Sequence, residues 1–294
     1  MARILVVGAS GFIGRRLIEQ LIKTDEVIAV AFESGPTSGA EGVEWIRWDI
    51  RAPIPQRLLP GRLDAVAHLA QAREYRRFPE LASDIAMVNL NGLINVLEAA
   101  RTAGAARVVF ASSGGVYQAG PGLRKESHPP APPNFYLATK LAGELLATGY
   151  RSFFDVVSLR LFFPYGLGQP ATRFIPDLVR RVVAGEPVQV QGSDGLKANP
   201  VHLEDAVTAL GRALALEGSH LINVAGPEVL TLRQMVELIG EQVGRPPVLD
   251  EAGVPGSRDL VADITLMKRL LGAPKSRFQD RISEVCREAT STIT

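Results

Sequence analysis

The sequence predicts an α/β protein with a doubly wound parallel sheet and a smaller C-terminal domain. Two observations carry this prediction. Short apolar segments alternate with helix-like segments through the first half of the chain, and a glycine-rich turn follows the first apolar segment. Strands that are apolar along their whole length are buried on both faces, which is typical of parallel sheets covered by helices.

The expected elements follow one another in a regular order. Residues 3–7 form an apolar run rich in β-branched side chains, and 13–23 then place Ile13, Leu17 and Leu21 at helical spacing. Further apolar segments predict strands, and two long segments between them predict helices. The strands are expected at 27–32, 43–48, 65–69, 108–111 and 156–160, and the helices at 84–103 and 135–148.

The second half of the chain is less regular. Glycine and proline become more frequent after Pro164, so a domain of 1–165 is expected to precede a smaller domain of 166–294, with part of 195–215 packing back on the first. Ligands of such sheets bind at the carboxyl ends of the strands. His68, Ser112 and Ser113 fall at these ends.

Composition excludes several classes of function. The 294 residues are 46% hydrophobic and 21% charged, and the net charge of +1 gives no electrostatic case for nucleic acid or an acidic membrane surface. No apolar stretch approaches the roughly 20 residues that span a bilayer. The first strand begins almost at Met1, so a signal peptide is not expected and a cytoplasmic location is.

Cysteine and histidine usage argues against disulfide and metal chemistry. The single cysteine, Cys286, excludes an internal disulfide, and its place in a polar C-terminal helix favours an inert thiol over a nucleophile. The four histidines are scattered and have no clustered cysteine or aspartate beside them. No metal site is therefore expected.

The glycine turn predicts a phosphate-binding site. Gly8 permits a tight turn, Gly11 lets the backbone approach a pyrophosphate, and Gly14 allows close packing of helix on strand. The N-terminus of the following helix stabilises phosphate charge. The spacing is GxxGxxG, one residue different from GxGxxG, and a chance match in a strand-turn-helix is the alternative. A bound dinucleotide is the functional interpretation.

Tyr136, Lys140 and Ser113 predict a proton-transfer site beside that dinucleotide. Removing a hydride from a carbinol carbon requires removal of the hydroxyl proton, and a tyrosine with a pKa of about 10 is a poor base at neutral pH. Lys140 lies one helical turn away, so it is expected to lower the pKa of Tyr136 and to reach the nicotinamide ribose. Ser113 would stabilise charge on the substrate oxygen. The alternative is a packed tyrosine and a solvent-facing lysine.

With these motifs the chain resembles the extended short-chain dehydrogenase/reductase family of NAD(P)-dependent sugar-nucleotide epimerases, dehydratases and reductases. The resemblance implies a Rossmann-type first domain and a substrate-binding second one. The segments that match the family span nearly the whole chain and follow one another in the order that the family has. The matching segments are 8–14, 49–50, 68–70, 89–92, 111–117, 136–140, 159–162, 165–166, 201–205 and 223–226.

The resemblance also implies residue roles. Ser113, Tyr136 and Lys140 would be the catalytic residues, and a homodimer is expected through the helix that holds Tyr136 and the helix before it. The cofactor residues would be Gly8, Ser10, Gly11, Phe12, Ile13, Gly14, Phe32, Glu33, Asp49, Ile50, Leu69, Ala70, Gln71, Val88, Asn89, Ala111, Ser112 and Phe162. The substrate residues would be Arg73, Phe163, Arg173, Asn199 and His202.

Cofactor choice depends on a departure from the family pattern. Family members that use NAD usually have an acid at the end of the second strand, where this chain has Ala31 or Phe32. Glu33 follows and could substitute, whereas Arg15 could meet a 2′-phosphate or simply lie on the helix surface. NAD is expected because Glu33 would repel a phosphate, and NADP stays open.

Further departures bear on the reaction. Gly114 and Gly115 follow Ser113 where the family's dehydratases have Asp-Glu, so 4,6-dehydration is not expected. Phe163 and Ala198 stand where epimerases usually have the Asn and Arg that hold a nucleotide diphosphate. Other cations would replace these anchors, or the substrate is not a nucleotide sugar. The candidate cations are Arg73, Arg76, Arg77, Arg173 and Lys197, although Arg76 and Arg77 also fit a solvated loop. For His202, a structural histidine is the alternative to a substrate-binding role.

Three functions remain open. The first is an NAD(P)-dependent epimerase that oxidises a sugar transiently and returns the hydride to the other face, acting on a sugar that carries a nucleotide. The second is a reductase of a keto sugar or another small carbonyl compound. The third is a dinucleotide-binding scaffold without turnover, which the intact Ser113, Tyr136 and Lys140 oppose.

Overall fold

The structure is a computed structural model that describes residues 1–32, 42–55, 58, 61–251 and 258–293. The chain forms two compact units. Unit 1 comprises Met1–Val116, Pro130–Arg160 and Val207–Ile222, and unit 2 comprises Tyr117–Pro129, Leu161–Ala206 and Asn223–Thr294. The chain therefore passes between the units several times, and the contiguous boundary near residue 165 stays a prediction.

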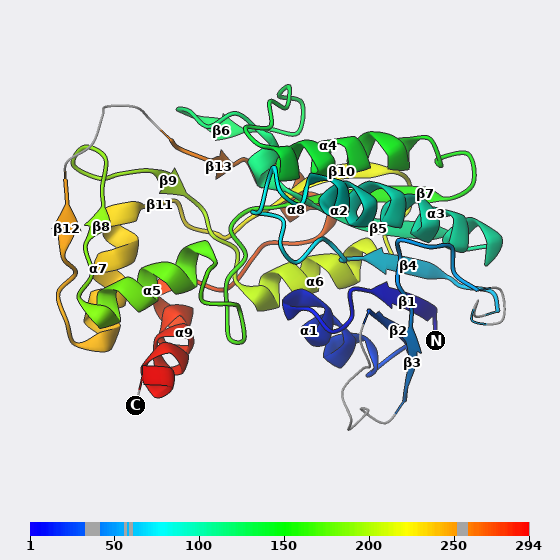
Figure 1. The fold of residues 1–294 in the computed structure, drawn as a ribbon, viewed down its shortest axis with the longest axis horizontal. Coiled ribbons are helices and arrows are strands. Elements are labelled where there is room, and N and C mark those ends of the chain that lie inside the picture. Colours follow the sequence, from blue (N-terminus) through cyan, green and yellow to red (C-terminus); the bar gives the residue numbers. More distant parts are fainter. Residues whose placement is uncertain (33–41, 56–57, 59–60, 252–257, 294) are drawn as a thin grey trace. The chain divides into compact units, whose positions relative to one another are not determined.

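Unit 1 is built around a seven-stranded sheet with the order β10-β7-β5-β4-β1-β2-β3 (Figure 1). The pairs β1–β2, β1–β4, β2–β3 and β4–β5 are parallel. The strands are β1 (Arg3–Val7), β2 (Glu26–Ala31), β3 (Val43–Arg47), β4 (Ala65–His68), β5 (Arg107–Ser113), β7 (Asp155–Leu161) and β10 (His220–Val224). The predicted doubly wound parallel fold is confirmed.

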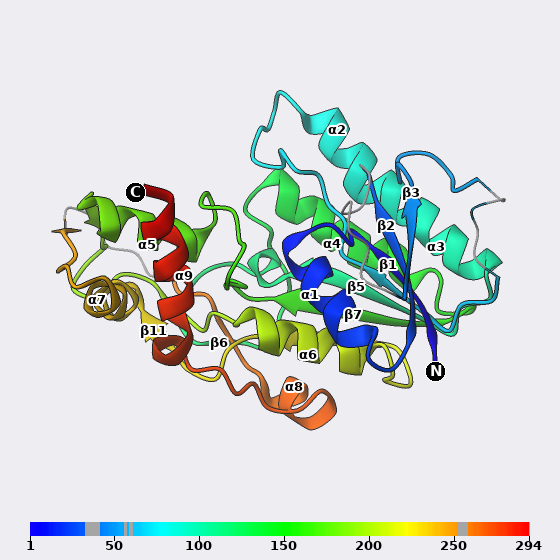
Figure 2. The same ribbon diagram turned by 90° about the horizontal axis from the view of Figure 1, so that it is seen from below.

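Helices cover both faces of this sheet. Figure 2 shows α1 (Phe12–Leu21) and α6 (Leu203–Ala213) on one face and α2 (Ala82–Ala86), α3 (Gly92–Thr102) and α4 (Phe135–Thr148) on the other. The predicted helix at 84–103 is continuous but includes a π-helical turn, η2 (Met87–Asn91), between α2 and α3. The helix at 135–148 has the predicted bounds. A short 3₁₀ turn, η3 (Gly114–Val116), follows β5.

The core of unit 1 lies between the sheet and its helices. Leu5, Ile28 and Val66 on the strands and Leu93 and Leu97 on α3 are completely buried or nearly so. Strands that carry apolar side chains on both faces need this double cover, since each uncovered side chain would return apolar area to water. The register then fixes the carboxyl edge of the sheet: Val7 lies opposite both Val30 and His68.

Unit 2 has a helical core with small two-stranded sheets. The helices are α5 (Phe174–Ala184), α7 (Leu232–Val243), α8 (Thr265–Leu270) and α9 (Phe278–Ile293). The pairs are β9 (Lys197–Ala198) with β11 (Leu230–Thr231), β8 (Val188–Gln189) with β12 (Leu249–Asp250), and β6 (Leu123–Arg124) with β13 (Val261–Ala262).

A cluster of buried apolar side chains joins α5, α7 and α9 in unit 2. Thr231 and Gln234 form a capping box at the start of α7, and Gly185 ends α5 in the left-handed conformation. Cys286 lies inside this cluster, where burial raises the pKa of its thiol to about 11. A thiol of that pKa is a poor nucleophile, in line with the inert role expected for it.

Within the described ranges, no helix has the length and apolar character needed to span a bilayer. The same residues contain no group of three or more His, Cys, Asp or Glu side chains arranged to hold a metal ion.

Candidate active site

The glycine turn between β1 and α1 is tightly packed. Gly8 has φ of +90°, and the backbone N–H groups of Gly8 and Ala9 donate to Val30 O at 3.2 and 3.0 Å. A Cβ at Gly8 would lie 2.7 Å from Ala70 N, and one at Gly14 would lie 2.3 Å from Gly8 O. Both positions therefore require glycine for close approach of backbone to backbone.

Gly11 is different because it faces outward. A Cβ there would meet Gly8 O at 3.2 Å and, its two neighbours in sequence aside, no other atom of the described residues within 4 Å, and the residue is exposed. Gly11 is the N-cap of α1, no side chain caps the helix there, and its first turn holds no acid, all within the described part of the chain. The amide groups at this helix end are therefore open to an anion, and the turn fits a dinucleotide pyrophosphate.

The adenosine end of the expected site lies at the ends of β2 and β3. Phe32 is 50% exposed directly after β2, and Asp49 and Ile50 follow β3. Ile50 is buried against Gly92, where a Cβ would lie 2.7 Å from Ile50 Cδ1. The expected role of Glu33 lies outside the described residues. The Arg15 side chain donates from Nε to Ser10 O at 2.9 Å and is exposed.

Unit 1 brings the three predicted catalytic residues to the same edge. Ser113 ends β5, and Tyr136 and Lys140 lie on α4. Asn134 caps α4 by accepting from Leu137 N at 3.0 Å, which fixes where the helix begins. Lys140 Nζ donates to Ala111 O at 2.9 Å on β5 and lies 5.9 Å from the centre of the Tyr136 ring.

Tyr136 and Ser113 have polar partners that orient them. The Tyr136 hydroxyl donates to Gln71 Oε1 at 2.7 Å, and the Tyr75 ring packs on the Tyr136 ring at 4.1 Å between centroids. Ser113 Oγ accepts from Gly115 N at 3.1 Å, so its own proton is left to donate. Gln71, which is expected beside the cofactor, thus contacts the tyrosine that is predicted to be catalytic.

Burial is the largest cause of the pKa shifts of Tyr136 and Lys140. It raises the pKa of the Tyr136 hydroxyl well above its ordinary value, and the bond to Gln71 offsets only part of that. It also lowers the pKa of the Lys140 ammonium to about 8, against the attraction of Glu144. The lowering of the Tyr136 pKa expected from Lys140 stays a prediction, because burial sets the direction of the Tyr136 shift here and the ammonium donates to Ala111 O.

A buried polar network lies one turn further along α4. The Arg160 guanidinium donates twice to the Glu144 carboxylate, from Nε at 2.9 Å and from Nη2 at 2.6 Å. Ser112 Oγ donates to the same carboxylate at 2.5 Å. The side chains of Arg160 and Glu144 are only 3% and 8% exposed. The sequence interpretation missed this network, although a charged Arg160 inside an apolar strand is the signal that could have revealed it.

Asn89 forms a second buried link. Its side chain accepts from Ala72 N at 2.8 Å and donates to Thr139 Oγ1 at 2.8 Å, and Thr139 Oγ1 donates to Tyr136 O at 2.7 Å. Asn89 lies in the π-helical turn η2, a feature frequent at functional sites. In this structure Asn89 connects the segment that carries Gln71 to the helix that carries Tyr136.

His68 is a buried neutral residue at the end of β4. Its ring stacks on Phe110 with 5.8 Å between centroids. Burial, with the charge of Lys140 as the second cause, lowers the pKa of His68 to about 3. Neither ring nitrogen has a hydrogen-bond partner in the part of the chain that the structure describes. A histidine of that pKa does not act as an acid near neutral pH.

The other cofactor residues expected in unit 1 lie on several of its elements and are buried to different degrees. Ser10, Phe12, Ile13, Leu69, Ala70 and Val88 are half-buried, and Ala111 and Ser112 are buried on β5. Arg73, expected to bind substrate, is exposed in the turn that follows Gln71. The contacts of these residues with a cofactor or substrate stay predictions.

The remaining expected residues belong to unit 2 and are described within it. Phe162 is buried against Tyr117, with 6.1 Å between ring centroids. Asn199 is buried, donates to Ala262 O at 3.0 Å and accepts from Ala262 N at 2.9 Å. His202 is buried, accepts from Glu204 N at Nδ1 and bonds Glu284 through Nε2. Desolvation lowers the pKa of His202, which fits the structural alternative.

Apolar side chains occupy the two positions where family epimerases hold a diphosphate. Ala198 is completely buried in β9, opposite Leu230 of β11. Phe163 has a positive φ of 44°, uncommon for a bulky residue, and its ring lies 5.2 Å from that of Phe174. Arg173, the N-cap of α5, is half-buried, and desolvation lowers the pKa of its guanidinium.

A model described as "NAD dependent epimerase/dehydratase family" matches residues 4–225. The chain is 30% identical to an uncharacterized UDP-glucose epimerase, YtcB, of Bacillus subtilis (strain 168), over 92% of each chain. It is 27% identical to a dTDP-4-dehydro-6-deoxy-D-allose reductase of Streptomyces sp, over 97% of this chain and 95% of the relative.

Among solved structures, MoeE5 in complex with UDP-glucose and NAD is similar with a TM-score of 0.83 and 28% identity. The similarity covers 99% of this chain and 100% of that one.

Proposed function

The chain belongs to the NAD dependent epimerase/dehydratase family, and on that premise we propose that it is an epimerase of a nucleotide sugar. It is an enzyme of the extended short-chain dehydrogenase/reductase type, and its cofactor is NAD. The family match covers most of unit 1 and part of unit 2. UDP-linked sugars are the first candidates, because a UDP-glucose epimerase and a UDP-glucose complex are among the similar proteins.

The observation that carries the proposal is the meeting of Ser113, Tyr136 and Lys140 in unit 1, on the sheet edge that also holds the glycine turn. When bound, NAD supplies a hydride acceptor that can later return the hydride. Tyr136 in its phenolate form takes the proton of the sugar hydroxyl, and Ser113 Oγ donates to the same oxygen. Lys140, held at Ala111 O, keeps a positive charge near the phenolate that forms.

Gln71 has a role in the same step. Its Oε1 accepts from the neutral Tyr136 hydroxyl, and its amide also carries N–H groups that a phenolate could accept from. In the proposed sequence the Tyr136 hydroxyl first gives its proton to solvent, and the Gln71 amide rotates so that its N–H group donates to the phenolate. The amide rotates back when the phenolate takes the proton of the sugar hydroxyl. Asn89 and Thr139 hold the two segments in place during this exchange.

A reductase of a keto sugar is the second candidate. The specific observation in its favour is the absence of a cation or amide at positions 163 and 198, since Phe163 and a buried Ala198 cannot hold a diphosphate as the family's epimerases do. The similarity to a dTDP-linked keto-sugar reductase points the same way. A reductase would consume reduced cofactor in proportion to product.

The test uses the purified protein with UDP-glucose, UDP-galactose and a dTDP-linked 4-keto sugar. An epimerase gives the inverted sugar by NMR with no net change in NADH absorbance, and a reductase gives stoichiometric loss of that absorbance. Tyr136→Phe is the matched variant: it should abolish either reaction while NAD binding is retained. No product with any of these sugars would count against the epimerase, and unchanged biological function of the variant would favour a scaffold.

The homodimer and the cytoplasmic location are parts of the same proposal. The expected dimer interface uses α4 and the α2–α3 segment, and apolar side chains there, such as Met87 and Leu145, are 41% and 65% exposed. Light scattering on the purified protein measures the mass, and a monomer at micromolar concentration would contradict this part.

A further inference from the structure

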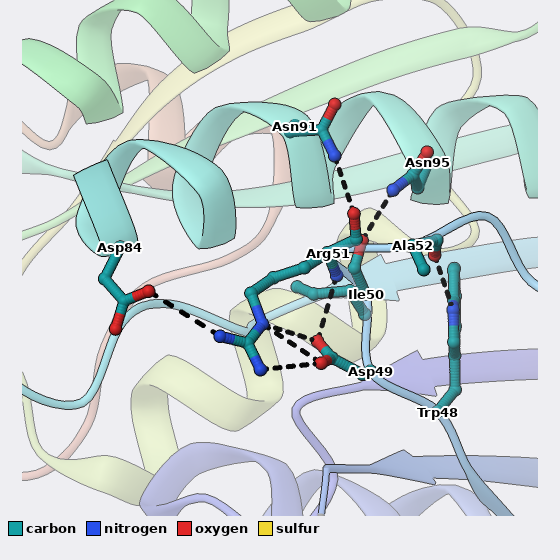
Figure 3. Close-up of polar contacts among 8 residues, drawn as sticks. All are labelled: Trp48, Asp49, Ile50, Arg51, Ala52, Asp84, Asn91 and Asn95. Carbon is teal, nitrogen blue, oxygen red and sulfur yellow. Dashed lines mark hydrogen bonds and ion pairs between the residues drawn. The ribbon is translucent and has the colours of Figure 1, made fainter.

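The Arg51 guanidinium is held by two carboxylates at the end of β3 (Figure 3). Its Nε donates to both oxygens of Asp49, at 3.1 and 3.0 Å, and its Nη2 donates to Asp49 Oδ2 at 2.8 Å. Its Nη1 lies 3.6 Å from Asp84 Oδ1 at the start of the helix opposite. The Arg51 Cζ atom lies 5.6 Å from the centre of the exposed Phe32 ring.

The backbone of this loop is fixed as well. Asn91 donates from its side chain to Arg51 O at 2.8 Å, and Asn95 donates to Ile50 O at 2.7 Å (Figure 3). Trp48 Nε1 donates to Ala52 O at 2.9 Å. Three side chains therefore hold the main chain of residues 50–52, so the direction in which Arg51 leaves the loop is set by the fold.

The loop of residues 49–52 lies beside the place where a doubly wound sheet binds the adenosine ribose of a dinucleotide. In doubly wound sheets the residue that contacts the 2′-hydroxyl lies about 20 residues past the glycine turn, at the end of the second strand. Here β2 ends at Ala31 and Phe32 follows. Ala31 pairs with Arg47, and Trp48 N donates to Ala31 O at 3.0 Å, so the chain after β3 continues beside the end of β2.

The charge at this place favours an uncharged ribose over a phosphorylated one. Asp49 and Asp84 bring two negative charges against the single positive charge of Arg51, and the Arg51 contacts are mostly taken up by Asp49. A 2′-phosphate carries nearly two negative charges at neutral pH. To pair with Arg51 it would have to displace a bidentate carboxylate and would then face both acids.

We propose that Asp49 and Asp84, acting through Arg51, make this site select NAD over NADP, in place of an acid at the end of β2. They hold the guanidinium over Phe32 beside the expected adenosine site, and their net negative charge repels a 2′-phosphate. This inference rests on the dinucleotide site of the proposed function, but it concerns binding alone and not turnover.

The test is calorimetric titration of NAD and NADP into the purified protein at low salt. Asp84→Asn removes the carboxylate that lies 3.6 Å from Arg51 Nη1, and Glu80→Gln is the matched control, an exposed carboxylate in the preceding turn. For Asp84→Asn we expect NADP to bind about three- to tenfold tighter with NAD unchanged within about twofold. The control should leave both affinities as they are.

Arg51→Ala distinguishes this proposal from the alternative that Arg51 binds the 2′-phosphate of NADP. If Arg51 were a phosphate receptor, its removal would weaken NADP far more than NAD, and that result would overturn the proposal. An unchanged NAD-to-NADP ratio in Asp84→Asn would overturn it too, as would failure of both dinucleotides to bind. Because the readout is affinity, a protein that turns over no nucleotide sugar but binds NAD selectively would support this inference while the proposed reaction failed.

Discussion

Removal of the Glu144 carboxylate should destabilise unit 1 by about 3–5 kcal/mol. In Glu144→Ala the Arg160 guanidinium, only 3% exposed, would keep its charge and lose the two hydrogen bonds that compensate it. A buried charge that loses its partner costs about 3–5 kcal/mol. The buried Ser112 hydroxyl would also lose its acceptor, and this loss is destabilising as well.

Urea denaturation followed by tryptophan fluorescence measures this loss. Both tryptophans, Trp45 and Trp48, belong to unit 1, so their emission reports on the unit that carries the network. The matched control is Glu19→Ala on α1, whose pair with Arg16 is 58% and 43% exposed. A surface pair of this kind contributes about 0–1 kcal/mol, so the control should unfold almost like the parent protein.

A loss in Glu144→Ala that equals the control would refute the reasoning. The double variant Glu144→Leu with Arg160→Leu supplies an internal check. Because it removes both charges instead of leaving one, it should recover part of the stability lost in the single variant. A double variant as unstable as the single one would mean that packing, and not an unpaired charge, carries the effect.

Three further predictions concern the site. Activity should fall as pH rises through about 8, because Lys140, whose pKa is lowered to about 8, then loses the charge that favours the phenolate; a pH-rate profile that stays flat to pH 10 would contradict this. Gly14→Ala should prevent folding, since its Cβ would lie 2.3 Å from Gly8 O. Gly11→Ala should instead give a folded protein, measured by circular dichroism, that binds NAD weakly. If the two variants behaved alike, the different roles assigned to Gly11 and Gly14 would be contradicted. Asn89→Ala should cost about 1–3 kcal/mol in urea unfolding, because it leaves buried groups unpaired; no loss would contradict the link.

The elements of unit 1 could be predicted because each carries its own local pattern. The run at β1 and the helix at α4 were located from apolar periodicity and have the expected bounds. The π-helical turn in the segment from α2 to α3 has no such pattern, and the partners of Asn89 within it, Ala72 N and Thr139 Oγ1, lie in distant segments. The strands of unit 2 are only two residues long, too short for any periodicity to appear.

The site was predictable in its residue types and less so in its electrostatics. Lys140 and Tyr136 were found from their spacing on one helix, but the partners of their polar atoms, Ala111 O and Gln71, come from other elements. Spacing gives proximity along a helix and says nothing of burial, which decides the pKa of both groups here. For the same reason the effect of Lys140 on the pKa of Tyr136 stays a prediction.

The edge position of β10 has a consequence for synthesis of the chain. The strand order places β10 beyond β7, so the sheet of unit 1 is complete only when residue 224 has left the ribosome. Until then β7, whose side chains from Val156 onward are buried in the finished protein, has an unpaired edge. Such an edge can pair with other chains. A fragment that ends near residue 165 should therefore aggregate, whereas nascent chains are protected once β10 has docked.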